Sequence, residues 1–339
     1  MRKFLTALSL LGLLAVLGCN KSENGAGTST VGTPPAGKKI TVALMPKSKG
    51  NAYFVSCKQG AEQAAKELGV ELIFDGPVSP DPAKQNEIIE NWITLGVDAI
   101  AAACENKDGI STALRKARDK GIKVITYDSD ANADAREFFV NQATAEGIGT
   151  TLMDEAARLT GGEGEFAIIT ASLTASNMNE WQKYIELRRA SKYPQMRMVA
   201  LRPCDDLKDK AQAEATTLLS AYPNLKLLMN ICSPAVPGAA EAVKQAGKTG
   251  RVKVIGLGLP SENRAYVKAG VTDSVILWKT TDLGYLTVLA AKAVADGTLK
   301  PGAESFAAGK LGTILIQGDN LLLGKPFIFN KDNIDQFDF

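Results

Sequence analysis

Short apolar runs alternate with amphipathic stretches from residue 39 onward. The run KKITVALM is rich in β-branched residues and ends before Pro46, and the stretch from Gly50 to Leu68 reads as an amphipathic helix that Gly69 closes. The same alternation continues through the apolar runs VELIFD, VDAIAAA and IKVITYD and the amphipathic stretches 80–95 and 107–120. Short strands that alternate with longer helices indicate βαβ units and a parallel sheet.

The alternation begins again after REFFVN. The apolar runs are now EFAIIT, MRMVALR, LKLLMNI and VKVIGLG, and the predicted helices span 143–160, 177–193, 208–221, 235–247 and 261–269. Near-continuous apolar strands such as VDAIAAA fit a sheet that helices cover on both faces. The simplest fold class is therefore α/β, with two doubly wound parallel-sheet lobes in succession.

The loops that follow the predicted strands are polar and irregular. In doubly wound sheets the functional crevice lies beyond the carboxyl ends of the strands. This rule selects the loops MPKSKGNAYF, ACENKD, YDSD, TASLTASN, RPCDD, NICSPA and LGLPSE. The last segment, which begins at SVILWKTTDLGYLT and continues through a helix to about Ala295, breaks the alternation. We expect the chain to cross again between the lobes there.

The start of the chain differs from the rest in composition. Arg2 and Lys3 precede an apolar run that is shorter than the roughly 20 residues of a membrane-spanning helix, so residues 1–18 read as a secretory signal peptide. The tripeptide that ends at Cys19 resembles a bacterial lipobox, in which the cysteine is acylated; an ordinary signal peptide with a chance cysteine is the alternative. Residues 19–38 are expected to form a flexible tether. We therefore expect an exported protein, lipid-anchored to a membrane, in the periplasm or at the cell surface.

Charge and residue types narrow the function. The chain has 39 basic and 37 acidic residues without a basic block, which argues against nucleic acid as a partner. It contains no histidine, which excludes Ser-His-Asp triads, Cys-His pairs and zinc sites built on histidine. No GxGxxG follows the first strand and no Walker A sequence occurs, so nucleotide binding is not indicated. We expect no catalytic residue, no metal and no cofactor.

Four cysteines beyond Cys19 stand far apart, at 57, 104, 204 and 232, without a CxxC pair. Export permits disulfides between them, and single buried thiols fit the sequence equally well. The sequence does not decide whether Cys57 pairs with Cys104 or Cys204 with Cys232.

Several loop residues carry side chains that suit a small polar ligand. Tyr53 and Phe54 stand at a helix start, where they either staple the helix to the core or cover the apolar face of a sugar ring. Lys47, in the same loop, is either a solvated charge or a ligand contact. Asp128, at the carboxyl end of a strand, can accept charge-assisted hydrogen bonds from two hydroxyls, or it can cap a turn.

The second half offers further candidates. Asn177 and Asn179 open a predicted helix, and because helix capping suits Asn177 we favour Asn179 as the ligand contact. Asp205 and Asp206 either chelate a cation or start the next helix. Trp278 either packs in the core or contacts the ligand.

These features together resemble a known family. The two-lobed alternation, the lipobox and YDSD resemble the type I periplasmic sugar-binding proteins of ABC transporters. VALMPKSKGNAYF, VITYDSD, SVILWKTTDLGYLT and FIFNKDNIDQFDF look like the branch that contains rhamnose-binding proteins and the receptor for autoinducer-2. The resemblance covers nearly all of residues 39–339, and the ending FNKDNIDQFDF and the segment DLGYL are its most specific parts.

The resemblance implies two α/β lobes, joined by three crossing strands, that close on one small sugar-like ligand. It places the crossings near 139–141, 275–278 and 318–325. It assigns 39–140 and about 276–318 to the first lobe, and 141–275 and about 319–339 to the second. The ligand contacts that it implies are Lys47, Tyr53, Phe54, Asp128, Asn177, Met178, Asn179, Ser233, Ala235 and Trp278.

The sequence departs from the autoinducer-2 receptors at several positions. Asn177-Met178 stands where those receptors have Asp-Gln, Ile231 where they have proline, and Lys279 where they have an acid. These departures favour a monosaccharide, with rhamnose or another deoxy sugar as the first choice.

We therefore expect a monomeric, lipid-anchored solute-binding protein that is not an enzyme. It would capture a monosaccharide between closing lobes, with Asp128, Lys47, Asn179 and Ser233 bonding the hydroxyls, and deliver it to the permease of an ABC transporter. The alternatives are an autoinducer-2 receptor of the same fold and a membrane-anchored, carboxylate-dependent sugar enzyme.

Overall fold

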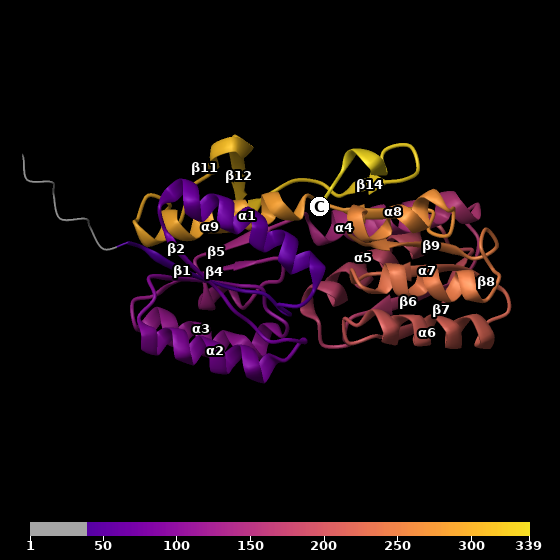
Figure 1. The fold of residues 1–339 in the computed structure, drawn as a ribbon, viewed down its shortest axis with the longest axis horizontal. Coiled ribbons are helices and arrows are strands. Elements are labelled where there is room, and N and C mark those ends of the chain that lie inside the picture. Colours follow the sequence, from indigo (N-terminus) through magenta and orange to yellow (C-terminus); the bar gives the residue numbers. More distant parts are fainter. Residues whose placement is uncertain (1–38) are drawn as a thin grey trace, which may run out of the picture. The chain divides into compact units, whose positions relative to one another are not determined.

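Two β-sheets carry the fold of residues 39–339, the part of the chain that the computed structural model describes. Each sheet is built from strands that alternate with helices, as the hydrophobic pattern predicts (Figure 1). The predicted signal peptide, Cys19 and the tether lie outside the described residues. Within residues 39–339 no helix has the length and apolar character needed to cross a bilayer.

The first sheet has eight strands in the order β11-β12-β13-β5-β4-β3-β1-β2. Its strands are β1 (Thr41–Met45), β2 (Glu71–Phe74), β3 (Ala99–Ala102), β4 (Lys123–Tyr127), β5 (Phe138–Asn141), β11 (Ser305–Ala307), β12 (Thr313–Gln317) and β13 (Asn320–Leu322). Its helices are α1 (Ala52–Leu68), α2 (Pro82–Leu95), α3 (Lys107–Asp119) and α9 (Thr280–Ala295). α1 and α9 cover one face of the sheet and α2 and α3 cover the other (Figure 1).

The second sheet has six strands in the order β14-β10-β9-β8-β6-β7. Its strands are β6 (Gly164–Thr170), β7 (Met196–Pro203), β8 (Leu225–Asn230), β9 (Lys253–Leu257), β10 (Ser274–Leu277) and β14 (Phe327–Phe329). Its helices are α4 (Ala145–Thr160), α5 (Ser176–Lys192), α6 (Lys208–Ala221), α7 (Ala235–Gln245) and α8 (Pro260–Lys268). All of its pairings are parallel except that of β14 with β10. The prediction of two doubly wound lobes is confirmed.

The chain passes between the sheets three times, after β5, after β10 and after β13. The last passage, between Leu322 and Phe327, overlaps the range 318–325 that the resemblance implies for the third crossing, and it follows the approximate lobe bound near 318 by a few residues. β13 still pairs with β5 of the first sheet, with Asn320 opposite Phe139 and Leu322 opposite Asn141. Residues up to Leu322 therefore belong to the first sheet.

Local sequence explains where the helices begin and end. α1 begins after Asn51, whose side chain accepts a 2.9 Å hydrogen bond from the N–H of Tyr53. It ends at Gly69, where φ is 66°, a left-handed conformation that glycine adopts without a steric penalty. The sequence predicts a helix over 50–68; the observed helix starts two residues later, at Ala52, and ends as predicted.

Two glycines allow α1 to lie directly against α9. A Cβ atom on Gly60 would overlap the carbonyl oxygen of Thr281, and one on Gly284 would overlap that of Cys57. The two helix backbones are therefore too close for a side chain between them at these points. This contact holds the start of α1, which carries Tyr53, near the crossing that carries Trp278.

Candidate functional site

Loops at the carboxyl ends of both sheets surround a cavity. The first lobe lines it with residues that follow β1, β3 and β4, and the second lobe with residues at the ends of β6, β7, β8 and β9. Leu277 and Trp278, at the crossing after β10, complete the lining. The cavity lies where the carboxyl-end rule placed the site.

Asp128 is the central carboxylate of the first lobe. It follows β4 with φ of 61°, a left-handed conformation that aspartate tolerates better than most residues. The side-chain amide of Gln142 donates a 3.0 Å hydrogen bond to its backbone carbonyl and supports this turn. The side chain is 5% exposed, and burial raises its pKa, an effect that Lys47 and the Tyr53 hydroxyl oppose.

A chain of hydrogen bonds connects the crossing to this carboxylate. The indole N–H of Trp278 donates to the Tyr53 hydroxyl at 2.8 Å, and that hydroxyl donates to Asp128 Oδ1 at 2.7 Å. Burial, and then the charge of Asp128, raises the pKa of Tyr53 well above its ordinary value, so the phenol remains a donor. Asp128 Oδ2 accepts no hydrogen bond within the described residues, so it is available to a ligand hydroxyl.

Lys47 and Glu105 form a second polar group in the first lobe. Lys47 is 4% exposed, and its Nζ donates to Asn177 Oδ1 of the second lobe at 2.8 Å. The same ammonium lies 3.9 Å from Glu105 Oε2. Ser172 donates to Glu105 Oε1 at 2.8 Å, while Oε2 is buried without a hydrogen-bond donor among the residues that the structure describes. A buried carboxylate oxygen without a donor is a strong acceptor for an incoming hydroxyl.

Asn51 connects the lobes on another side of the cavity. Its side-chain N–H donates to Asp206 Oδ2 at 2.6 Å, and its Oδ1 accepts from Ser233 at 3.1 Å. Asp206 has φ of 58°, and burial raises its pKa to about 6. The lobes are therefore held together by side-chain hydrogen bonds on both sides of the cavity.

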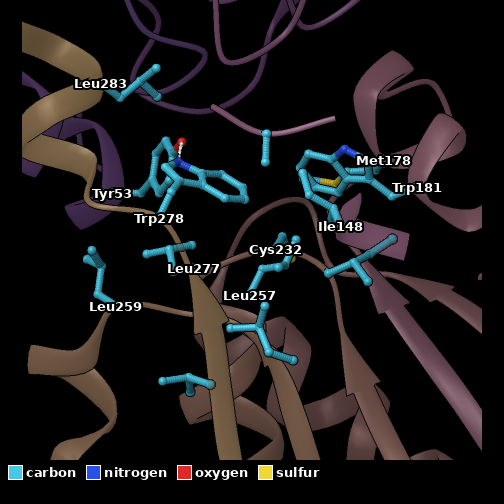
Figure 2. Packing of buried hydrophobic residues seen from close by; sticks show 14 of the residues in the cluster. Tyr53, Ile148, Met178, Trp181, Cys232, Leu257, Leu259, Leu277, Trp278 and Leu283 are labelled. Atoms are coloured by element: carbon cyan, nitrogen blue, oxygen red, sulfur yellow. Dashed lines mark hydrogen bonds between the residues drawn. The ribbon is translucent and has the colours of Figure 1, made fainter. Parts of the chain in front are cut away.

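The remaining wall is apolar and aromatic. Trp278 lies beside Met178 and Trp181 of α5, as Figure 2 shows, and the two tryptophan rings meet in an edge-to-face contact with centroids 6.3 Å apart. Ile231, Leu257 and Leu277 continue this wall. Phe54, which is 3% exposed, supports it from the first lobe through edge-to-face contact with Tyr53 and Tyr127.

The structure brings most of the predicted contacts together. The predicted residues that line the cavity are Lys47, Tyr53, Phe54, Asp128, Asn177, Met178, Ser233 and Trp278. Asn179 does not line it, because it stands on the exposed side of α5 and its amide donates to the carbonyl of Leu173 at 3.1 Å. Ala235 is fully buried at the start of α7, where its N–H donates to the carbonyl of Cys232.

Several lining residues were missed by the sequence reasoning. Glu105 lies in the selected loop ACENKD but is not among the predicted contacts, and Asp206, in the loop RPCDD, is predicted only as a cation ligand or a helix start. Trp181 stands four residues after Asn177 on α5, a spacing that puts both on the same face of the helix. Asp205 is exposed and pairs with Lys210, and within residues 39–339 no group of three or more acidic or cysteine side chains is arranged to hold a metal.

Comparisons with known proteins agree with this geometry. The chain matches the family model for the periplasmic binding protein domain over residues 42–299. It is 29% identical over 254 residues to the D-allose-binding periplasmic protein of Escherichia coli (strain K12), which covers 71% of this chain and 80% of that protein.

Solved structures extend the similarity to nearly all of the described residues. An ABC transporter solute-binding protein from Clostridium phytofermentas with bound L-rhamnose is 31% identical, with a TM-score of 0.84 over 88% of this chain and 98% of that chain. LsrB from Clostridium saccharobutylicum in complex with AI-2 is 26% identical, with a TM-score of 0.84 over 88% of this chain and 100% of that chain.

The family match spans most of the chain, and these relatives are binding proteins rather than enzymes. The chain therefore belongs to the periplasmic binding protein family, as a type I sugar-binding protein of the kind that serves ABC transporters.

Proposed function

We propose that this protein is a lipid-anchored solute-binding protein that captures a monosaccharide, L-rhamnose or a similar 6-deoxy sugar, and hands it to the permease of an ABC transporter. The observation that carries the proposal is the division of the cavity into a polar side and an apolar wall. A 6-deoxy sugar has the same division, because its hydroxyls need hydrogen-bond partners and its methyl group does not. The similarity to a solute-binding protein with bound L-rhamnose supports the choice.

The polar contacts follow from the geometry. Asp128 Oδ2 and Glu105 Oε2 accept no hydrogen bond from the residues that the structure describes, and they would receive ligand hydroxyls. Lys47 and Asn177, which bond to each other across the cavity, would each give or share a hydrogen bond with the sugar. Ser233 would contact a hydroxyl from the second lobe. Asn179, whose amide bonds to Leu173, has no part in this arrangement.

The apolar contacts would hold the ring and the methyl group. Aromatic faces bind the C–H surface of sugars through hydrophobic and dispersion interactions. Trp181 and Trp278 would supply such faces from two different parts of the fold. Met178 and Ile231 would surround the methyl group.

Binding would stabilise the closed arrangement of the lobes. The ligand contacts come from loops of both sheets, so they exist together only when the lobes are closed. A ligand that binds one of two conformations better than the other shifts the population toward it. The closed form would then be the one that the permease recognises.

Calorimetric and thermal-shift titration of the protein with L-rhamnose, L-fucose, D-ribose, D-allose and autoinducer-2 tests the proposal. At a ligand concentration of a hundred times Kd the stability should rise by about 2.7 kcal/mol. We expect this shift with L-rhamnose or L-fucose, and the sugar should be recovered unchanged. Absence of a shift with every sugar would contradict the monosaccharide proposal, and a changed sugar would favour the enzyme alternative.

Autoinducer-2 is the second candidate ligand. Lys47 and Asp128 both line the cavity, and the autoinducer-2-bound LsrB has the same fold at 26% identity. Asn177, Met178 and Ile231 also line it, and these are positions where the sequence departs from that receptor branch. The same titration separates the two, because a shift with autoinducer-2 alone would replace the deoxy sugar.

The anchor, the location and the oligomeric state are part of the proposal. Cys19 would carry the lipid, so the Cys19→Ala protein should leave the membrane fraction, and the mass of the unaltered mature protein should include acyl chains. We propose that the protein acts as a monomer, which light scattering of the detergent-solubilised protein checks. Membrane retention of the Cys19→Ala protein would contradict the anchor.

A further inference from the structure

Cys204 and Cys232 are buried free thiols whose Sγ atoms lie 3.4 Å apart. Cys204 directly follows β7, and Cys232 is the second residue after β8. These strands flank β6 on opposite sides. The N–H of Cys204 donates to the carbonyl of Thr170, and that of Ile231 to the carbonyl of Ile169, so both loops bend over the carboxyl end of β6. The sulfur atoms meet there.

Within the described part of the chain, the other two buried cysteines have no sulfur neighbour. Cys57 belongs to the hydrophobic cluster on the α1 and α9 face of the first sheet. Cys104 belongs to the cluster on the α2 and α3 face, and its thiol donates to the carbonyl of Ala102. The sheet therefore separates Cys57 from Cys104, and of the two pairings that the sequence leaves open only Cys204 with Cys232 has adjacent sulfur atoms within residues 39–339.

We propose that Cys204 and Cys232 form a disulfide in the exported protein. The periplasm, where relatives such as the D-allose-binding protein reside, permits disulfides. The oxidant is a disulfide, either of a thiol-disulfide oxidoreductase or of a small molecule. One cysteine thiolate attacks it and releases a thiolate, and the second cysteine then displaces the other half. One S–S bond is formed and one is reduced, and the two thiol protons leave with the reduced oxidant.

The bond forms as the lobe folds rather than afterwards. Burial raises the pKa of the Cys232 thiol well above its ordinary value, and the neighbouring Cys204 adds to this effect. Because the thiolate is the reactive form, exchange is slow once this site is packed. In the unfolded lobe both thiols are exposed to the oxidant and have ordinary reactivity.

The disulfide would join two loops that reach the first lobe. Asp206 is the second residue after Cys204, and Ser233 directly follows Cys232; both bond to Asn51. Cys232 itself lines the cavity, beside Leu257 (Figure 2). The disulfide would therefore form part of the cavity wall. It would also couple the loops of Asp206 and Ser233, so that their two contacts to Asn51 move together.

Thiol mapping of the unaltered, exported protein tests the proposal. The protein is purified without reductant, denatured in N-ethylmaleimide, digested and analysed by mass spectrometry. We expect a linked peptide that contains Cys204 and Cys232, with Cys57 and Cys104 alkylated. Alkylation of all four cysteines, or a linkage that involves Cys57 or Cys104, would overturn the proposal. The mapping needs no variant and no ligand, so it is independent of the proposed function.

A thermal measurement gives a second readout. Protein that is unfolded and refolded in reductant should have a Tm about 5 °C lower than the unreduced protein, because the closed loop constrains the unfolded chain. The matched control, Cys57→Ser with Cys104→Ser, should retain this reductant-dependent difference, and Cys204→Ser with Cys232→Ser should lose it. A Tm that does not respond to reductant in the unaltered protein would count against the disulfide.

Discussion

The two lobes contribute different chemistry to the cavity. The first lobe brings Lys47, Glu105 and Asp128, whose exposed fractions are 4%, 2% and 5%. The second lobe brings mainly Met178 and Trp181 with their apolar neighbours. Burial of a charge costs free energy unless a partner satisfies it, whereas an apolar wall is stabilised by any apolar surface that covers it. Under the proposed function, the first lobe would therefore contribute most to selecting the pattern of hydroxyls, and the second lobe would contribute mainly to selecting shape and apolar groups.

Substitution of the central carboxylate of the first lobe should weaken ligand binding more than any other change considered below. Asp128→Asn keeps a residue that tolerates the positive φ of this position but removes the charge. Affinity for L-rhamnose should fall about thirtyfold, or about 2 kcal/mol, because hydrogen bonds to a charged group are the strong ones. Calorimetric titration measures the change.

Asp205→Asn is the matched control for that substitution. Asp205 also has positive φ, at 52°, but it is exposed and does not line the cavity. Its substitution should leave affinity within about twofold. If both variants bind equally well, Asp128 is not a ligand contact.

Loss of an aromatic ring from the second lobe should have the next largest effect. Trp181→Ala removes a side chain that is 5% exposed, lines the cavity and contacts the Trp278 ring edge-to-face. Affinity should fall about tenfold through lost apolar contact. Leu187→Ala, on the same helix but 55% exposed, is the control and should bind normally. A Trp181→Ala protein that is folded and binds normally would refute the role of this wall.

A pair of sugars tests the apolar wall of the second lobe without any substitution in the protein. L-mannose differs from L-rhamnose only in a hydroxyl on C6, which the apolar wall of Met178 and Ile231 cannot satisfy. Burial of an unpaired hydroxyl costs about 1 kcal/mol or more, so L-rhamnose should bind about fivefold more tightly. Competition titration gives the ratio. A preference for L-mannose would show that C6 faces the polar side.

The smallest effect should come from the carboxylate of the second lobe. Burial raises the pKa of Asp206 to about 6, above that of an aspartate in the unfolded chain. The folded state therefore binds more protons than the unfolded state between about pH 4 and 6, so the free energy of unfolding falls as pH rises through this window. Above about pH 7 the effect is constant.

Asp206→Asn should remove this part of the pH dependence. The Tm difference between the variant and the unaltered protein should change by about 2 °C between pH 4.5 and 7.5, with the variant relatively more stable at the higher pH. Asp128, whose pKa burial also raises, acts in both proteins, and the comparison therefore isolates Asp206. Parallel Tm curves over this range would show that Asp206 titrates normally.

Much of the fold could be predicted from the sequence because it depends on local features. The pattern of apolar residues has the period of a helix or a strand, and Gly69 ends α1 as predicted. The final strands were harder, because β13 joins the first sheet only through its pairing with β5, which lies far away in the sequence. The sequence favours Asn179 over Asn177 because helix capping suits Asn177, and only the packing of α5 shows which side chain faces the cavity.

Sequence alone therefore established the alternating elements, the α/β class and the loops that hold the site, since each depends on residues that are neighbours in the chain. The tertiary structure decided which side chains meet. Tyr53 donates to Asp128 across 75 positions, and Lys47 to Asn177 across 130. Cys204 meets Cys232 because β7 and β8 flank β6. Such contacts depend on the order of strands in a sheet and on the closing of two lobes, and no local pattern of residues contains either.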